Sequence, residues 1–429
     1  MSPSPLVIEP LTGRPDVVIS VPGSKSHTNR ALICAALARG VSTLEGALFA
    51  DDTRAMVGAL SQLGIDVSAD PHRASIRIIG CDGQVPAGPA SFDVVQSGTT
   101  GRFLACLAAL GPGPYVIDGD DQLRARPFGQ LVRALRTLGA DIDGERLPMT
   151  IGGGGLSAGT VQLPGSVSSQ FLSGLLMAAP YATPGSDGQE ETIIEITDDQ
   201  VSTPYVALTM ATMASFGVKV DHDHHRHFVI GPQRYQARTV DIEPDASAAS
   251  YFFAAAAITG GRVRIMGLNS ETVQGDSRFV DLLEAMGATV RRSDDWIEVE
   301  GGRPLRGITI DMAEISDVAQ TLAVVAAFAT TPTTVTGIGF IKAKETDRVS
   351  AVVSELTKLG IRAEQIDDGF IVHPGQPQPA TVMTHGDHRM AMSFALFGLV
   401  YEGISLDDPD CVAKTFPTYF AVLDQLGSP

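Results

Sequence analysis

The chain of 429 residues has few cysteines, few aromatic residues and no long apolar run. Its four cysteines, Cys34, Cys81, Cys106 and Cys411, form no CxxC pair, and Cys34 and Cys106 lie within apolar stretches. We therefore expect buried, reduced thiols rather than a disulfide framework or a thiolate metal site. Aromatic residues make up 6% of the chain, with a single Trp. The hydrophobic cores must then be built from aliphatic side chains and alanine.

Basic residues are also scarce, because 31 Lys and Arg stand against 49 Asp and Glu, a net charge of −18. This charge argues against a broad nucleic-acid or anionic-membrane surface, which would need a basic face. No apolar run reaches about 18 residues, so we predict no membrane span. The N-terminal MSPSPLVIEP has no basic segment followed by an apolar one. We expect a cytoplasmic protein in which any phosphate site gathers its cations locally.

One phrase occurs six times: a short amphipathic stretch that ends in an apolar residue and a glycine. The copies are ALSQLGIDV, ALRTLGADI, TMASFGVKV, LLEAMGATV, ELTKLGIRA and VLDQLG, with glycines 67 to 78 residues apart at Gly64, Gly139, Gly217, Gly287, Gly360 and Gly427. A glycine directly after a helix suits the left-handed conformation that ends many helices. A second β-like run follows each of the first five copies. The phrase thus predicts helix, strand, turn and strand.

A second series of six helical stretches alternates with the first. They cover residues 24–40, 97–113, 166–180, 245–261, 315–331 and 385–403. The start of each carries Ser, Thr or Asp, which cap helices, and each continues as a run that is apolar nearly all round, which is typical of buried helices. LxxLG could recur by chance in an Ala- and Leu-rich protein, but six copies in step with a second series argue against chance. We predict six βαβαββ units of about 70 residues, in two groups of three.

The starts of the six buried helices are polar. A helix N-terminus carries unpaired N–H groups and a partial positive charge, so it is a natural anion site. If the buried helices of one group run parallel, their starts share one surface. The residues there are Lys25, Ser26, Arg30, Thr99, Arg102, Ser168, Ser169, Gln170, Asp245, Asp317, Asp387, His388 and Arg389. This set fits a phosphorylated, polyhydroxylated ligand better than it fits a core.

Three further stretches carry charge or histidine that could belong to a site. IKAKETDRVS (341–350) by itself indicates a solvated charge cluster, and Lys414 in CVAKTFPTYF (411–420) by itself indicates a surface lysine. Both would also suit a phosphate site. HDHHRH (222–227) directly follows a repeat helix, and we interpret it as a surface turn rather than a metal site.

Nine motifs occur in order between about residue 20 and residue 420. They are PGSKSHTNRAL, GTTGR, RARPFG, GSVSSQF, VSTPY, EISDVAQ, KETDR, GDHRMAM and AKTFPTYF. In these the chain resembles the 5-enolpyruvylshikimate-3-phosphate (EPSP) synthase family. The resemblance implies an α/β fold of two similar domains, each with three βαβαββ units and buried parallel helices, an inside-out α/β barrel. It implies one domain of residues 1–22 with 243–429 and another of residues 23–242, with the active site in a cleft between them.

The resemblance also implies a reaction: the enolpyruvyl group of phosphoenolpyruvate moves to the 5-hydroxyl of shikimate 3-phosphate, and phosphate is released. No metal or redox cofactor is implied, and we expect a monomer with small-molecule partners only. Asp317 would take the hydroxyl proton, Glu345 would handle the proton at C3, and Lys25 would lie near the bridging oxygen and the phosphate. The residues implied for phosphoenolpyruvate are Lys25, Gly98, Arg126, Gln170, Arg348, Arg389 and Lys414. Those implied for shikimate 3-phosphate are Lys25, Ser26, Arg30, Ser168, Ser169, Gln170, Ser202, Asp317 and Lys344.

The chain departs from the family's usual residues at five positions, Gln96, Ser97, Phe103, Ser316 and Phe340. None of them is an implied catalytic group, so the departures bear on substrate choice and on the response to glyphosate, a competitor of phosphoenolpyruvate. Gly98 is retained, which implies sensitivity; an alanine there would imply resistance.

Three other functions compete with this interpretation. The related enolpyruvyl transferase that acts on UDP-N-acetylglucosamine typically has Lys-Asn and a loop cysteine, whereas this chain has Lys25-Ser26 and no cysteine near RARPFG. A kinase of the P-loop type would need GxxxxGK[ST], which is missing. A non-catalytic or specialised homologue that binds a shikimate-like anion would keep the cations and lose Asp317 or Glu345, and both are present.

Overall fold

The computed structural model describes residues 5–427, which form two compact units. We name Met1–Pro22 with Glu243–Pro429 the terminal unit, and Gly23–Ile242 the central unit. Each unit has its own hydrophobic core, and the residues of one core do not occur in the other. The two units are therefore described separately.

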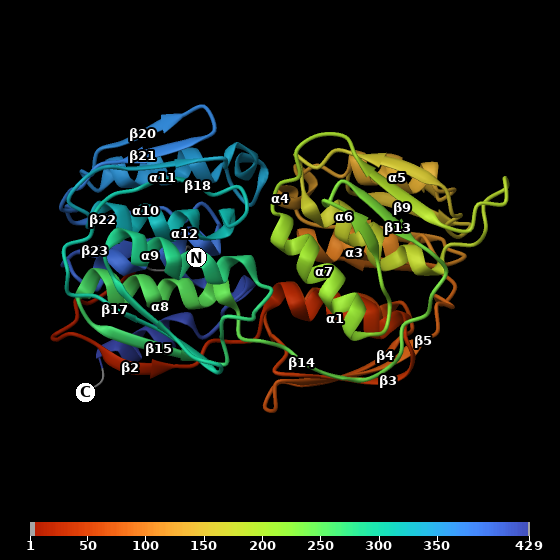
Figure 1. The fold of residues 1–429 in the computed structure, drawn as a ribbon, viewed down its shortest axis with the longest axis horizontal. Coiled ribbons are helices and arrows are strands. Elements are labelled where there is room, and N and C mark those ends of the chain that lie inside the picture. The colour runs from red at the N-terminus through yellow and green to blue at the C-terminus, as the bar shows by residue number, and fades with distance from the viewer. Residues whose placement is uncertain (1–4, 428–429) are drawn as a thin grey trace. The chain divides into compact units, whose positions relative to one another are not determined.

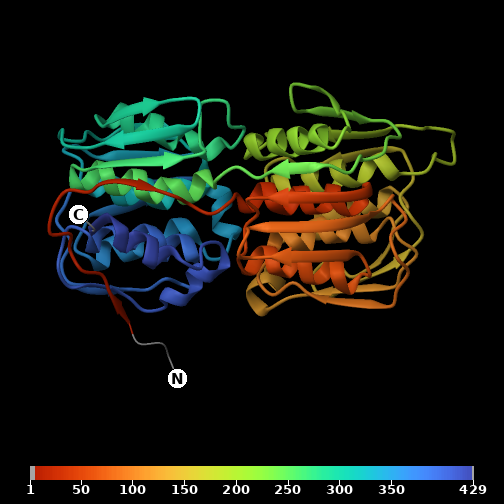
Figure 2. The ribbon, with the colours of Figure 1, turned by 90° about the horizontal axis from the view of Figure 1, so that it is seen from below.

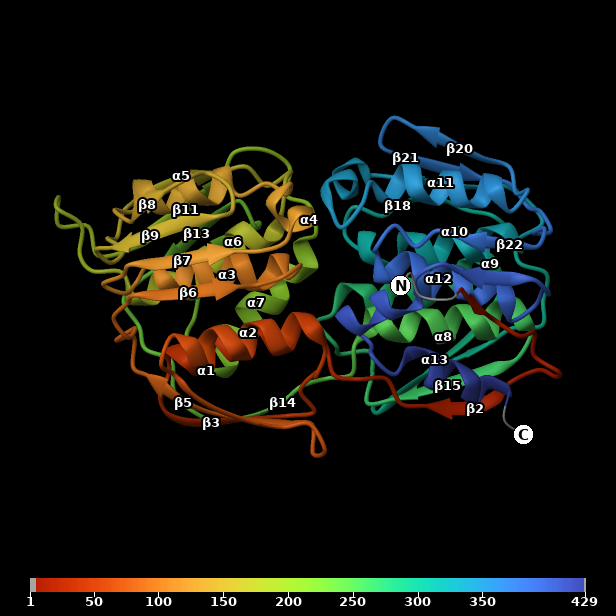
Figure 3. The same ribbon diagram turned by 180° about the vertical axis from the view of Figure 1, so that it is seen from behind.

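The central unit alternates helices with short strands (Figure 3). Its helices are α1 (Lys25–Leu37), α2 (Asp51–Gln62), α3 (Gly98–Ala108), α4 (Asp121–Arg124), α5 (Gly129–Thr137), α6 (Ser169–Ala178), the 3₁₀ helix η1 (Ala179–Tyr181) and α7 (Thr203–Ser215). Its strands are β3 (Arg39–Glu45), β4 (Asp66–Asp70), β5 (Ser75–Cys81), β6 (Ala90–Asp93), β7 (Tyr115–Asp118), β8 (Asp141–Asp143), β9 (Met149–Gly153), β10 (Thr160–Leu163), β11 (Thr192–Ile196), β12 (Asp221–Asp223), β13 (His227–Ile230) and β14 (Thr239–Asp241).

The terminal unit has the same alternation (Figure 1). Its helices are α8 (Ala246–Thr259), η2 (Gly275–Arg278), α9 (Phe279–Met286), η3 (Ser316–Val318), α10 (Ala319–Ala327), η4 (Gly339–Ala343), α11 (Arg348–Lys358), α12 (His388–Gly398), η5 (Pro409–Lys414), α13 (Tyr419–Leu423) and η6 (Asp424–Gly427). Its strands are β1 (Leu6–Val7), β2 (Asp16–Ile19), β15 (Arg262–Met266), β16 (Thr289–Arg292), β17 (Trp296–Glu300), β18 (Thr309–Asp311), β19 (Thr333–Thr336), β20 (Ala363–Ile366), β21 (Gly369–Val372), β22 (Ala380–Val382) and β23 (Ile404–Leu406).

Six small sheets reproduce the predicted repeat. In the sheet β6-β7-β9-β8 the first two strands are parallel, and β9 pairs antiparallel with both β7 and β8. The same order recurs in β10-β11-β13-β12 and in β18-β19-β21-β20. A parallel pair needs a crossover, which the buried helix supplies, whereas the antiparallel pair closes with a short turn. The βαβαββ unit predicted from the sequence is therefore confirmed in these sheets.

The remaining sheets borrow strands from distant parts of the chain. Strand β14 pairs in parallel with β3, and β2 pairs in parallel with β15. Figure 2 shows β2, in red, running beside β15, in green, within the terminal unit. The sixth sheet has three strands, because β1 pairs antiparallel with β23 where the other repeats place a hairpin. The last repeat is thus completed by the N-terminal segment.

The six helices predicted to be buried form the two cores. Every residue of α3, α10 and α12 is buried, and α8 is almost as enclosed. Small residues allow these helices to approach closely: a Cβ at Gly174 of α6 would lie 2.7 Å from Cys106 Sγ of α3. Five of the six helices start with a side-chain cap, from Ser24, Ser97, Ser168, Asp245 and Asp387. The sixth, α10, instead follows the 3₁₀ turn η3, which carries Asp317.

The repeated glycines behave as predicted in five copies. Gly64, Gly139, Gly217, Gly287 and Gly360 have φ between 78° and 117°, the left-handed region. The sixth expectation is wrong, because Gly427 lies within η6 and does not have a positive φ. Gly427 is instead the last residue of the 3₁₀ turn η6.

The prediction of buried, reduced cysteines is confirmed for Cys34 and Cys106 and is wrong in burial for Cys81 and Cys411. All four cysteines are free, and burial raises the pKa of Cys34 to about 12. Cys81 and Cys411 are only half-buried. HDHHRH spans the end of β12, the turn at residues 224–226 and the first residue of β13. Among residues 5–427, no helix is both long and apolar enough to cross a membrane.

Candidate functional site

In the terminal unit, the starts of three helices meet around Arg348, the first residue of α11. Its guanidinium donates to the α12 cap Asp387 (Nε to Oδ2, 2.7 Å), to Glu345 (Nη2 to Oε2, 2.8 Å) and to Asp317 (Nη1 to Oδ1, 3.1 Å). Arg348 is 1% exposed, and the side chains of Asp387 and Glu345 are 0% and 7% exposed. The prediction that KETDR is a solvated charge cluster is therefore wrong for Glu345 and Arg348, which are buried.

The protonation of Arg348 follows from this arrangement. Burial alone would lower its pKa, but the carboxylates of Asp387, Glu345 and Asp317 together raise the pKa above the usual value. The residue is therefore a permanent cation. This guanidinium is fixed and already desolvated, so it would not lose bulk water on exchanging a carboxylate partner for a substrate anion.

Asp317 is the most accessible carboxylate bound to Arg348. Its side chain is 16% exposed, against 0% and 7% for the other two. Besides Arg348 it accepts from Arg389 of α12 (Nη2 to Oδ2, 2.7 Å), and Lys344 Nζ lies 3.8 Å from Oδ1. Asp317 is thus a carboxylate reachable by a ligand and surrounded by three cations.

Two more predicted or nearby groups belong to this part of the terminal unit. Lys414, at the end of η5, is 5% exposed, so it is not a snorkelling surface lysine. Asp276 in η2 is 3% exposed and accepts from Ser247 Oγ of α8. Asp276 was not predicted, because QGD lies in none of the motifs and only the packing of η2 on α8 buries it.

In the central unit, Gln170 of α6 binds two residues at the start of α3. Its Oε1 accepts from Arg102 Nη1 of α3 at 2.5 Å, and its Nε2 donates to Thr99 Oγ1 at 3.0 Å. Arg102 is held further by Pro127 O at 3.1 Å, and it lies over the Phe128 ring. The starts of α3 and α6 therefore meet, as the sequence predicts for parallel buried helices.

Arg30 is more buried than a simple ligand-binding residue would be. It is 1% exposed, and its guanidinium donates to Thr209 Oγ1 (2.7 Å), Ser26 O (2.9 Å), Tyr205 O (3.1 Å) and Ser173 Oγ (3.2 Å). Burial lowers its pKa to about 10, which still leaves it charged at neutral pH. Arg30 therefore ties α1 to α6 and α7.

Lys25, the first residue of α1, has a partner that the sequence did not reveal. Its Nζ lies 3.4 Å from Oδ2 of Asp52 in α2, and the two side chains are 13% and 4% exposed. Asp52 occurs in an ordinary helix start, so a buried role could not be distinguished from a helix-dipole role in the sequence. The ion pair holds the ammonium at the start of α1.

Gly98, the first residue of α3, faces Arg126. A Cβ built on Gly98 would lie 2.9 Å from Nη1, 3.0 Å from Cζ and 3.1 Å from Nη2 of Arg126. Arg126 is 7% exposed. The absence of a side chain at Gly98 is therefore what allows the guanidinium to lie against the backbone of α3.

The predicted serines lie at helix starts or in tight turns. Ser168 caps α6, and Ser169 follows it at 6% exposure. Ser202 precedes α7 with a left-handed φ of 54° and is 6% exposed. Ser26 lies in the first turn of α1, where its carbonyl accepts from Arg30.

The departures from the family's residues fit their surroundings. Ser97 caps α3, Phe103 lies under the Arg30 guanidinium at 5.2 Å, and Phe340 packs partly buried on the terminal core. Gln96 accepts from Gly98 N at 3.0 Å through its carbonyl, and Ser316 is buried in η3. None of them displaces one of the charged groups above.

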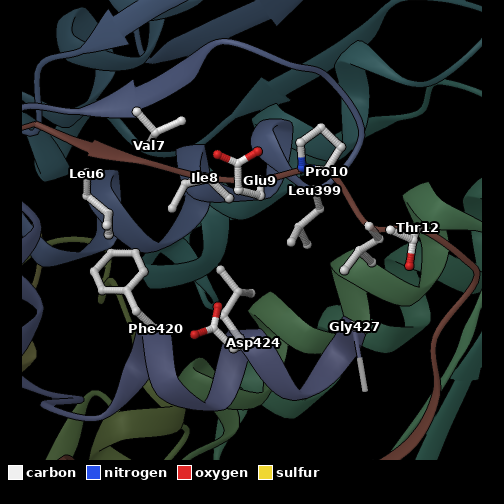
Figure 4. Close-up of a pocket in the computed structure, with 12 residues that line it drawn as sticks. Leu6, Val7, Ile8, Glu9, Pro10, Thr12, Leu399, Phe420, Asp424 and Gly427 are labelled. Carbon is white, nitrogen blue, oxygen red and sulfur yellow. The ribbon is translucent and has the colours of Figure 1, made fainter. Parts of the chain in front are cut away.

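One cavity lies away from these residues. Its volume is about 410 Å³, and it is bounded by the N-terminal segment Leu6–Thr12 together with Leu399, Phe420 and the end of the chain near Gly427 (Figure 4). None of the predicted site residues lines it. Within residues 5–427, no cluster of three or more His, Cys, Asp or Glu is arranged to hold a metal ion.

Known proteins resemble the chain over nearly its whole length. The family model for EPSP synthase (3-phosphoshikimate 1-carboxyvinyltransferase) matches residues 10–423. A 3-phosphoshikimate 1-carboxyvinyltransferase of Nostoc punctiforme is 46% identical over 423 residues, which cover 97% of this chain and 98% of the relative. One of Yersinia pestis is 43% identical over 425 residues, covering 96% and 98%.

Solved structures agree with these relatives. An EPSP synthase of Acinetobacter baumannii, solved at 2.37 Å, has a TM-score of 0.83 at 26% identity and covers 99% of this chain and 98% of its own. Its fold is therefore that of the chain described here. With nine motifs in order, the repeated sheets and the Arg348 cluster, the matches show that this chain belongs to the EPSP synthase family.

Proposed function

We propose that the chain transfers the enolpyruvyl group of phosphoenolpyruvate to the 5-hydroxyl of shikimate 3-phosphate and releases phosphate. Family membership supports this reaction. The observation that carries it is the partly exposed Asp317 carboxylate between Arg348 and Arg389, at 3.1 and 2.7 Å. Such a carboxylate suits a general base, and its cations suit an anionic substrate.

In the proposed addition step, Asp317 takes the proton of the 5-hydroxyl of shikimate 3-phosphate. The oxygen of that hydroxyl bonds to C2 of phosphoenolpyruvate. C3 gains a proton through Glu345, which gives a tetrahedral intermediate. In the elimination step the C2–O bond to the phosphate breaks, with Lys25 beside the bridging oxygen, and C3 returns its proton. Each step moves charge between oxygens, so fixed cations stabilise the transition states.

The contacts of Asp317 suggest how binding and catalysis are linked. Arg348, Arg389 and Lys344 all favour its ionised form and so make it a weak base. We propose that phosphoenolpyruvate, held also by Lys25, Gly98, Arg126, Gln170 and Lys414, competes for the two guanidiniums. Because the arginines then turn to the substrate anion, Asp317 becomes a stronger base only when that substrate is present.

For shikimate 3-phosphate we propose binding mainly by the helix starts of the central unit, through Lys25, Ser26, Arg30, Ser168, Ser169, Gln170 and Ser202, with Asp317 and Lys344 of the terminal unit. Ser169 and Ser202 are each 6% exposed, so a ligand can still reach them, and their hydroxyls could donate to its phosphate or hydroxyl groups. A monomer and a cytoplasmic location also stay predictions.

Phosphate release by the purified protein tests this function. We expect release from phosphoenolpyruvate with shikimate 3-phosphate, and none with UDP-N-acetylglucosamine or without an acceptor. Release with UDP-N-acetylglucosamine alone would assign the other enolpyruvyl transfer. Binding of shikimate 3-phosphate without any release would identify a specialised or inactive homologue and overturn the proposal.

Gly98→Ala provides a prediction for the phosphoenolpyruvate contacts. The new methyl group would lie within about 3 Å of the Arg126 guanidinium, which must move. We expect KM for phosphoenolpyruvate to rise roughly tenfold, inhibition by glyphosate to weaken and kcat to change less, since a binding group is displaced rather than a base lost. Steady-state kinetics measures this split. A KM within twofold of the original value would show that Arg126 does not contact phosphoenolpyruvate.

A further inference from the structure

Two loops of the central unit carry serines that we propose for shikimate 3-phosphate. Strands β10 and β11 run parallel and end side by side. The first loop, residues 164–168, follows β10 and ends at Ser168, directly before Ser169 of α6. The second loop, residues 197–202, follows β11 and ends at Ser202, directly before α7. Ligands commonly bind at loops that follow the carboxyl ends of parallel strands. The spacing of these serines therefore depends on how the two loops are held together.

Asp198 of the second loop binds the first loop through both of its carboxylate oxygens. Its Oδ1 accepts from Gly165 N at 2.5 Å and from Ser166 N at 3.0 Å, and its Oδ2 accepts from Ser166 Oγ at 2.6 Å. Burial would raise the pKa of Asp198, but the hydrogen bonds from Ser166 and Gly165 lower the pKa below its usual value. Asp198 is therefore ionised at neutral pH, and its charge is bound within the protein.

The backbones of the two loops are also in direct contact. Val201 N donates to Gly165 O at 3.1 Å. A Cβ on Gly165 would lie 2.8 Å from Cα of Gln200, so only glycine allows this approach. Ser202, which follows Val201, has a left-handed φ of 54°, which residues other than glycine seldom adopt unless their surroundings hold them. The first loop thus supplies part of what holds Ser202 in place.

We propose that Asp198 is a positioning residue that joins the two loops and so fixes the distance between Ser168 and Ser202 that shikimate 3-phosphate requires. This inference rests on the proposed function. A loop that is ordered before binding loses little conformational freedom when the substrate binds, so the affinity is higher. Asp198 acts through the first loop, at Ser166, rather than on the substrate, because a carboxylate would repel the phosphate group.

The substrate affected distinguishes this role from a general structural one. The groups proposed for phosphoenolpyruvate alone, such as Arg126 and Arg348, belong to neither loop. Asp198→Ala removes the acceptor of all three hydrogen bonds and so loosens the first loop. We expect Kd and KM for shikimate 3-phosphate to rise about tenfold, and kcat and KM for phosphoenolpyruvate to stay within about twofold. Calorimetric titration of shikimate 3-phosphate and steady-state kinetics measure these quantities.

Three further variants sharpen the test. Asp198→Asn keeps the size and an oxygen for the two N–H groups, and the Ser166 hydroxyl can accept from the new amide, so Kd for shikimate 3-phosphate should stay within about threefold. Ser166→Ala removes only the hydroxyl donor, so we expect a rise of about threefold in the same constant. Asp199→Ala is the matched control. Asp199 is the neighbouring aspartate, is 96% exposed and pairs with Arg226 at 2.7 Å, so its variant should keep the original values.

The outcomes separate the inference from the proposed function. A rise in D198A that is confined to shikimate 3-phosphate and largely restored in D198N would support the positioning role. Original values of Kd and KM in an active D198A would overturn the inference and leave the proposed function intact. Equal rises for both substrates, or a lower thermal midpoint alone, would assign Asp198 a structural role only and also overturn the inference. An unaltered enzyme that neither binds nor turns over shikimate 3-phosphate would overturn the proposed function and this inference with it.

Discussion

Asp317→Asn should lower kcat for enolpyruvyl transfer by about a thousandfold, the loss expected when a positioned general base is removed. Asparagine fills the same volume and can still accept from Arg348 or Arg389, which contact Asp317 at 3.1 and 2.7 Å. It cannot take up a proton from the substrate hydroxyl. Binding should survive, since neutralising one anion among three cations does not repel an anionic substrate. Stopped-assay kinetics with shikimate 3-phosphate, together with calorimetric titration of that substrate, measures both quantities.

Glu314→Gln is the control for this variant. Glu314 lies three residues earlier, is 52% exposed and pairs with Arg278 at 2.8 Å. It therefore loses the same charge without touching the helix starts, and we expect kcat within twofold of the original. If D317N kept more than a tenth of the activity, Asp317 could not be the base. If its affinity for shikimate 3-phosphate fell a thousandfold while kcat stayed high, Asp317 would act in binding alone and not as the base.

The repeats were predictable because they depend on local chemistry. A glycine after an amphipathic stretch favours a left-handed turn wherever it occurs, and five of the six glycines have that conformation. Runs of Ala, Leu and Val without a polar face must be buried, as α3 and α12 are. Strand exchange is different. β14 pairs with β3 and β2 with β15 across about two hundred residues or more, and a strand of three or four residues does not encode its partner.

The site, like the fold, has features that the local sequence predicts and others that only tertiary packing decides. Caps such as Asp387 and Ser168 could be predicted because a polar residue before an apolar run has few other uses. The partners Asp52 and Asp276 could not, since an aspartate in a helix start or a turn is usually solvated, and only tertiary packing makes it buried. The interpretation of KETDR as a solvated charge cluster was wrong for Glu345 and Arg348 for a related reason. Its Arg348 is buried because carboxylates from three separate helix starts surround it.

Arg348→Met should destabilise the terminal unit by about 3 to 5 kcal/mol at neutral pH, the usual cost of leaving buried charges without their partner. Methionine matches the apolar part of the side chain, so packing changes little. Asp387 and Glu345, at 0% and 7% exposure, lose the guanidinium that binds them at 2.7 and 2.8 Å. Without it, burial raises the folded-state pKa of a carboxyl, which costs stability above the unfolded pKa and not below it. The deficit should therefore shrink as the pH falls from about 7 to about 5.

Urea unfolding followed by tryptophan fluorescence isolates this effect, because the single Trp of the chain, Trp296, lies in β17 of the terminal unit. Arg278→Met is the control: it breaks the exposed pair with Glu314 at 2.8 Å and should cost less than about 1 kcal/mol. A deficit for R348M as small as that of R278M would mean that the three carboxylates find other partners or water. A deficit that stayed constant down to pH about 5 would instead point to lost packing. Only a large, pH-dependent deficit fits a cation that holds three helix starts together by charge, and such a cation is already oriented for a substrate anion.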